Sequence, residues 1–127
     1  MLKKAQGVAL LRVTLGLLFL VPGISKLMNP AGITGMLETI GFPAAALFAW
    51  IVIIIEVLGG AALILGKKTK EAVWALFIVL LVALLLVHLP AFDMANQATV
   101  MDVLWRLVGL GGLLSLQATG PGKLFAN

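Results

Sequence analysis

Cysteine is absent from this 127-residue sequence, and histidine occurs once, at position 88. The absence of cysteine excludes disulfide exchange, thiolate metal sites and cysteine-ligated iron–sulfur clusters on this chain. A single histidine excludes a bis-histidine haem within one copy, and the methionines show no ligand spacing. We therefore expect this chain to bind no metal and no electron-carrying cofactor of its own, and we assign no residue a catalytic role.

Charge is also scarce, and apolar residues take its place. Charged residues make up 11% of the chain and hydrophobic residues 62%, whereas soluble domains are about 25% charged. The mean hydropathy is +1.18. Such a chain has too little polar surface to cover a water-soluble globule, which indicates an integral membrane protein. The net charge of +4 is better explained by where the basic residues lie than by nucleic-acid binding.

Long apolar runs occupy most of the chain. A membrane-spanning helix needs roughly 20 apolar residues, and four segments fit, at about 7–28, 44–66, 72–89 and 99–118. The first run is too long for a signal peptide, contains Arg12 and lacks a small-x-small cleavage site, so we expect it to be retained. We predict an all-α, integral membrane four-helix bundle that forms one domain over residues 1–127. A soluble redox domain would then belong to a partner.

The basic residues outside the apolar runs predict the orientation in the membrane. Lys and Arg concentrate on the cytoplasmic side of membrane proteins, so we expect the N-terminus, the C-terminus and the turn "GKKTKE" in the cytoplasm. The opposite side then holds two loops, and the weak helical period of "ITGMLETI" is compatible with a segment along the membrane surface. The basic residues that carry this prediction are Lys3, Lys4, Lys67, Lys68, Lys70 and Lys123.

Glu56 lies inside the apolar run "WIVIIIEVLGG". A charge at the centre of a bilayer costs about 2.5–3.5 kcal/mol on insertion scales, so this carboxylate should face the bundle interior and find a partner. At about 1.5 Å per residue, Arg12 and Arg106 both lie at depths within reach. We expect one of them to pair with Glu56. The buried charges either fix the register of the helices or form a site for a ligand or a proton, and the residues alone leave both interpretations open.

Other polar residues share helical faces with these charges. Asp102 and Arg106 are four residues apart and can pair along one helix. His88 ends the third apolar run. It is either bonded to backbone or water at the membrane surface, or part of an outward-facing cluster with Lys26, Asp102 and Arg106 that could bind a quinone carbonyl or an anionic head group. Small residues that let membrane helices approach closely are Gly16, Gly59, Gly60, Gly109, Gly111 and Gly112. The candidate residues for a ligand site or a buried polar network are Arg12, Lys26, Glu56, His88, Asp102 and Arg106.

Four motifs, in order along the chain, resemble the DoxX family of small bacterial and archaeal membrane proteins. They are "LLRVTLGLLFLVPGISKL", "IIEVLGGAALILG", "VHLP" and "TGPGK"; the chain departs from the family pattern at its final "LFAN". The resemblance implies a multi-pass protein of the cell membrane that serves as an accessory, non-catalytic subunit of a quinone-linked redox or redox-stress system. It implies a quinone as ligand and a redox enzyme as partner. It also supports the six candidate residues and the turn at 120–122 as positions to test.

Two other functions compete with this one. A small-molecule or proton pathway would need a homo-oligomer, because four helices make a thin bundle. A purely structural assembly protein would keep the buried charges only to set helix register. The lipid bilayer is the expected surrounding in all three readings, and no nucleic-acid partner is expected.

Overall fold

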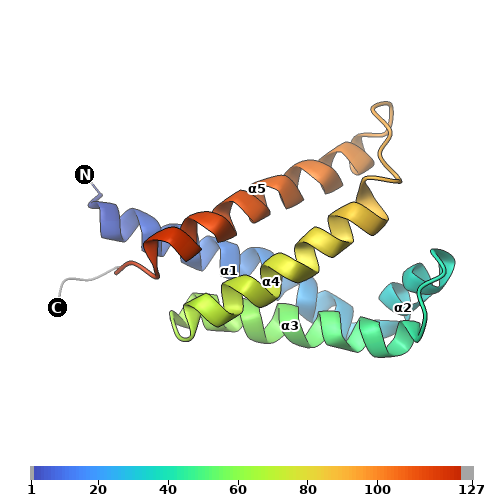
Figure 1. The fold of residues 1–127 in the computed structure, drawn as a ribbon, viewed down its shortest axis with the longest axis horizontal. Coiled ribbons are helices and arrows are strands. Elements are labelled where there is room, and N and C mark those ends of the chain that lie inside the picture. Colours follow the sequence, from blue (N-terminus) through green and yellow to red (C-terminus); the bar gives the residue numbers. More distant parts are fainter. Residues whose placement is uncertain (1, 124–127) are drawn as a thin grey trace.

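The computed structural model describes residues 2–123, so the final "LFAN" lies outside the described residues. Within that range the chain is all-helical, without strands, and four helices are long and apolar enough to cross a membrane. The predicted all-α bundle with four spans is thereby confirmed (Figure 1). The elements are α1 (Lys4–Met28), α2 (Pro30–Thr39), α3 (Ala45–Leu65), α4 (Thr69–Ala83), its π-helical extension η1 (Leu84–His88) and α5 (Gln97–Thr119).

The helix ends follow local hydrogen bonding rather than hydropathy. At the start of α1, the Lys3 backbone N–H donates to Gln6 Oε1 at 2.9 Å, which caps the helix about one turn before the apolar run begins. The Asn96 side chain accepts from the Ala98 N–H at 3.1 Å and caps α5 in the same manner. The ends of the helices therefore lie a few residues outside some of the predicted ranges.

The loop after α1 is mostly the short helix α2. Pro30 occupies its first turn, where a missing N–H costs nothing. Ile33 and Leu37 of α2 are buried and pack against Ala49 and Ile53 of α3. The weak helical period in this loop thus marks a real helix, and that helix covers the end of α3.

Close backbone contact joins α1 to α3. A methyl group added at Gly60 would lie 2.7 Å from the Leu20 nitrogen, and one added at Gly16 would lie 2.8 Å from the Gly60 carbonyl oxygen. Gly59, Gly109 and Gly112 instead receive leucine side chains of neighbouring helices. The expectation for Gly111 is wrong, because nothing lies within 4 Å of a methyl group built there.

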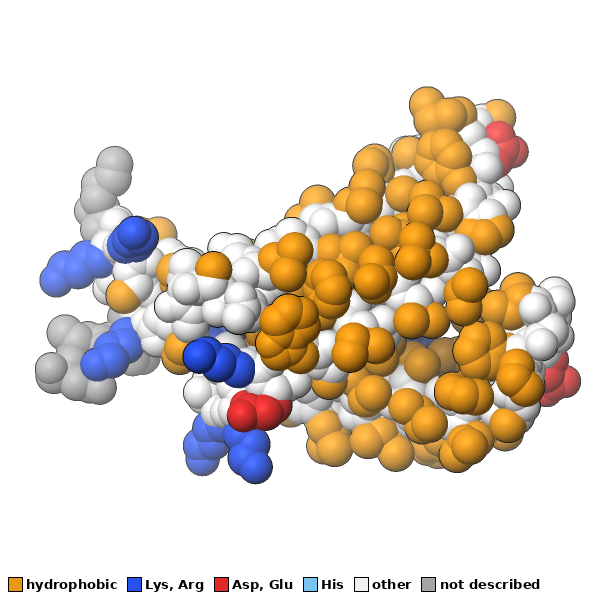
Figure 2. Space-filling view, in the orientation of Figure 1, with side chains coloured by type: hydrophobic (Ala, Val, Ile, Leu, Met, Phe, Trp, Pro, Cys, Tyr) orange, Lys and Arg blue, Asp and Glu red, His pale blue; other side chains and the backbone are white. Residues whose placement is uncertain are grey.

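The bundle has two distinct ends. Lys123 N–H donates to the Ala5 carbonyl at 3.0 Å, so the last described residues return to the start of α1 (Figure 1). The turn between α3 and α4 lies at this same end, where Figure 2 shows the basic side chains gathered. We call it the basic end, after Lys3, Lys4, Lys67, Lys68, Lys70 and Lys123. At the opposite, loop end, α4 and α5 diverge from α2 and α3 (Figure 1).

Candidate functional site

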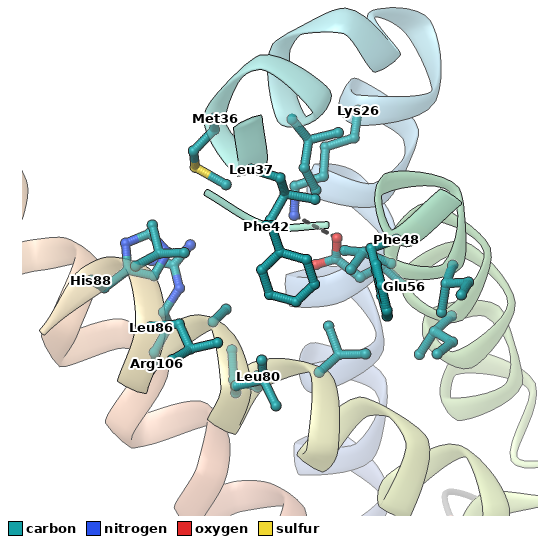
Figure 3. Close-up of a pocket in the computed structure, with 18 of the residues that line it drawn as sticks. Lys26, Met36, Leu37, Phe42, Phe48, Glu56, Leu80, Leu86, His88 and Arg106 are labelled. Atoms are coloured by element: carbon teal, nitrogen blue, oxygen red, sulfur yellow. Dashed lines mark hydrogen bonds and ion pairs between the residues drawn. The ribbon is translucent and has the colours of Figure 1, made fainter. Parts of the chain in front are cut away.

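A pocket of about 460 Å³ opens at the loop end, where the helices diverge. Its walls come from α2, α3, α4 with η1, and α5, and one residue of α1 reaches it (Figure 3). Most of its lining is apolar. Phe42 packs edge-on against Phe48, with ring centroids 4.8 Å apart. The polar residues that line it are Lys26, Glu56, His88 and Arg106, beside Trp105.

Lys26 and Glu56 form one polar wall of the pocket. Lys26 Nζ lies 2.5 Å from Glu56 Oε1, and the side chains are 30% and 5% exposed. Gly23 lets α1 approach here, because a methyl group at that position would lie 3.0 Å from Glu56 Cβ. The carboxylate therefore has a partner on a different span, as its depth in the bilayer requires.

The prediction that an arginine pairs with Glu56 is wrong, because its partner is Lys26. The glycine contact between α1 and α3 sets the register of the two helices, and this register places Lys26 beside Glu56. Arg12 lies about 21 Å from Lys26 along α1, at 1.5 Å per residue. Arg106 lines the same pocket, but it forms its ion pair with Asp102.

Arg106 and His88 form the second polar wall. Arg106 Nη1 donates to the Asp102 carbonyl oxygen at 2.8 Å and lies 3.6 Å from Asp102 Oδ1, which confirms the predicted pairing four residues apart. The Arg106 Cζ atom stands 4.1 Å from the centroid of the Trp105 ring. Its Nε is buried without a hydrogen-bond partner among the described residues. The guanidinium is therefore fixed by its own helix and keeps hydrogen-bonding capacity to spare.

His88 is the last residue of η1. The wide turn is closed by the Leu89 N–H, which donates to the Leu84 carbonyl at 2.8 Å. Figure 3 shows His88 beside Arg106 at the rim of the pocket, and no described residue is hydrogen bonded to its ring. Of the outward-facing cluster expected from the sequence, His88, Lys26 and Arg106 line one pocket. Asp102 is outside the lining and reaches it through Arg106.

Arg12 belongs to a different part of the molecule. It is only 7% exposed and its Nη1 donates to the carbonyl oxygens of Leu63 at 2.5 Å and Ile64 at 3.1 Å. Its Nε donates to the Pro121 carbonyl at 2.8 Å. These carbonyls lie at the end of α3 and in the Gly-Pro-Gly turn, so Arg12 ties both to α1. Arg12 is thus a structural residue, apart from the candidate residues that line the pocket.

Two contributors to the pocket escape sequence reasoning. The first is α2, whose Met36 and Leu37 lie over the cavity (Figure 3). The second is Trp105, which packs against the core and Arg106 besides its place in the lining. Every span is apolar, so hydropathy cannot separate side chains that line a cavity from those that fill the core. Within residues 2–123, no three histidine, aspartate or glutamate side chains gather as metal ligands.

Comparison with known proteins yields one family and several relatives. The DoxX family model matches residues 7–89. The uncharacterized membrane protein Rv3486 of Mycobacterium tuberculosis is 33% identical, over 92% of this chain and 77% of its own. "Putative oxidoreductase CatD" of Bacillus subtilis is 35% identical, over 71% of this chain and 66% of its own. The inner membrane protein YphA of Escherichia coli is 31% identical, over 89% of this chain and 82% of its own. No solved structure matches the chain significantly.

Proposed function

Because the chain belongs to the DoxX family, we propose that it is an accessory membrane subunit of a quinone-linked redox or redox-stress system, and that its pocket binds the quinone. The observation that carries the proposal is the pocket itself, an apolar cavity with polar side chains on two walls. Its volume of about 460 Å³ falls within the range of about 300–1,000 Å³ that is usual for small-molecule sites. The name of CatD, as an oxidoreductase, supports the redox half of the proposal.

The walls of the pocket reach the apolar outer surface of the bundle. Ile51 is 40% exposed, Ile78 59%, Val82 42% and Leu86 49%, and all four also line the cavity. In a bilayer such side chains meet lipid rather than water. A quinone with an apolar tail would therefore enter sideways from the membrane, and its tail would stay in the hydrocarbon.

The proposed orientation places the pocket in the outer half of the bilayer. The basic end carries every lysine of the described residues except Lys26, and Lys and Arg concentrate in cytoplasmic loops. The pocket lies at the opposite end, beside the loops that hold Glu38 and Asp93. The chain has no cysteine and one histidine, so electrons would be carried by a partner enzyme. This chain would hold and present the quinone to that partner.

A pathway across a single copy has less support. Phe19, Leu63, Leu76 and Leu113 are completely buried and pack together between the pocket and Arg12. This core fills the middle of the bundle with hydrocarbon. A proton or a polar solute would thus have no row of polar groups to follow from one end to the other.

Quinone titration of the full-length protein in lipid nanodiscs tests the proposal. Trp105 lines the pocket, so binding of a short-chain 1,4-benzoquinone should quench tryptophan fluorescence in a saturable manner. Ala83→Phe fills the pocket and should abolish that saturable phase. Ala75→Phe, on the same helix and outside this pocket, is the matched control and should bind like wild type. Quenching that never saturates, or that is the same in Ala83→Phe, would reject the pocket as a quinone site.

A further inference from the structure

The two polar walls of the pocket both keep hydrogen-bond donors that the protein does not use. A lysine ammonium has three donors, and one of those on Lys26 goes to Glu56. Arg106 Nη2 makes no hydrogen bond with the described residues, and neither does the His88 ring. Buried or half-buried polar groups are usually satisfied by a partner. Each wall therefore has N–H groups to which an acceptor oxygen of a ligand can bind.

The walls stand on opposite sides of an apolar gap. Figure 3 shows Lys26 and Glu56 on one side, His88 and Arg106 on the other, and the Phe42 ring between them. Leu37 and Leu80 also line this gap. A ligand that satisfies both walls must bridge the gap, and the part that bridges it must be flat or thin and apolar.

The formal charges around the pocket cancel in pairs when Asp102, which lies outside the lining, is counted. Lys26 is paired with Glu56, and Arg106 with Asp102. An anionic head group would add a negative charge with no unpaired cation to receive it, and burying an uncompensated charge is costly. A neutral acceptor oxygen carries no such cost, since it needs only the unused N–H groups.

We propose that the pocket recognises a neutral ring with an acceptor oxygen at each of two opposite edges. One oxygen accepts from Lys26 Nζ and the other from Arg106 Nη2. The ring packs beside Phe42, and an attached apolar chain leaves through the lipid-facing side chains of α3 and α4. This inference rests on the proposed function and adds to it the head-group chemistry and the two points of contact.

Two charge-neutral double variants isolate the two contacts. Lys26→Met with Glu56→Gln removes the first wall without leaving a buried charge, and Arg106→Met with Asp102→Asn removes the second. Each should weaken binding of a decyl-substituted 1,4-benzoquinone about tenfold or more, because one hydrogen bond to a charged donor is lost. Lys70→Met, an exposed lysine at the basic end, should bind like wild type.

Ligands that differ in their oxygens test the same geometry in the wild-type protein. A decyl phenol, with one ring oxygen, should bind about tenfold more weakly than the quinone and should be indifferent to one of the two double variants. Decanoate, which is anionic, should not displace the quinone. This series still decides the question if one double variant fails to fold.

The outcomes separate the inference from the function on which it rests. Absence of saturable quinone binding by the wild-type protein overturns both. Quinone binding that is unchanged in either folded double variant overturns the two-point recognition alone. Equal affinity for the phenol, or displacement by decanoate, does the same.

Discussion

Lys26 Nζ at the end of α1 lies 2.5 Å from Glu56 Oε1 in the middle of α3. The pair joins two spans, forms one wall of the pocket and satisfies the most deeply buried carboxylate among the described residues. Its position follows from the backbone contact at Gly16 and Gly60, which sets the register of α1 against α3. Packing of two helices thereby determines the chemistry of the cavity beside them.

Breaking this pair on one side should destabilise the protein more than removing it altogether. Lys26→Met leaves Glu56 buried and unpaired, and loss of one partner of a buried pair costs about 3–5 kcal/mol. We expect about 3 kcal/mol, since the Lys26 side chain is 30% exposed and water screens part of the interaction. The double variant with Glu56→Gln should recover most of the loss. Denaturant unfolding in detergent micelles measures both, and equal stability of Lys26→Met and wild type would argue against the pair.

Arg12 should matter for stability and leave ligand binding unchanged. Arg12→Lys keeps the charge, but one ammonium cannot reach the three carbonyls that the guanidinium fork contacts. We expect a loss of about 1–3 kcal/mol from carbonyls left without a donor. Thermal unfolding measures this loss. Quinone affinity of the folded variant should equal that of wild type, and a large drop in affinity would mean that the two ends of the bundle are coupled.

The glycines offer a matched test of helix packing. Gly60→Ala forces a methyl group against the backbone of α1, and overpacking of this kind costs about 1–3 kcal/mol. Gly111→Ala has free space around it and should stabilise the helix by up to about 1 kcal/mol. The free energy of unfolding should therefore be larger for Gly111→Ala than for Gly60→Ala. Gly111→Ala as the less stable of the two would contradict the packing described here.

Much of the fold can be predicted from the sequence because its determinants are local. Span length and hydropathy predict the four long helices, and the spacing of Asp102 and Arg106 predicts their pairing along one turn. The partner of Glu56 is not local. It depends on how two glycines set the register between α1 and α3. The depth of each residue in the membrane does not reveal that register, so depth alone cannot distinguish Lys26 from an arginine as the partner.

The pocket is less predictable for the same reason. Its polar residues stand out against apolar spans, and four of the six candidates do line it. Its apolar walls do not stand out, because Phe42, Leu80 and Leu86 look like any other residues of a membrane helix. Gly111 and Gly112 are adjacent in the chain, yet only Gly112 faces a neighbouring side chain, which no composition rule distinguishes.

The orientation in the membrane can be tested with single cysteines, since the chain has none of its own. Lys70→Cys places a thiol at the basic end, and Asp93→Cys places one in the exposed loop between η1 and α5. Because basic loops stay in the cytoplasm, a membrane-impermeant maleimide should label Asp93→Cys in intact cells and Lys70→Cys only after permeabilisation. The parent chain, without cysteine, is the control for background. Labelling of Lys70→Cys in intact cells would mean that the topology is inverted, and the pocket would then lie in the cytoplasmic half of the bilayer.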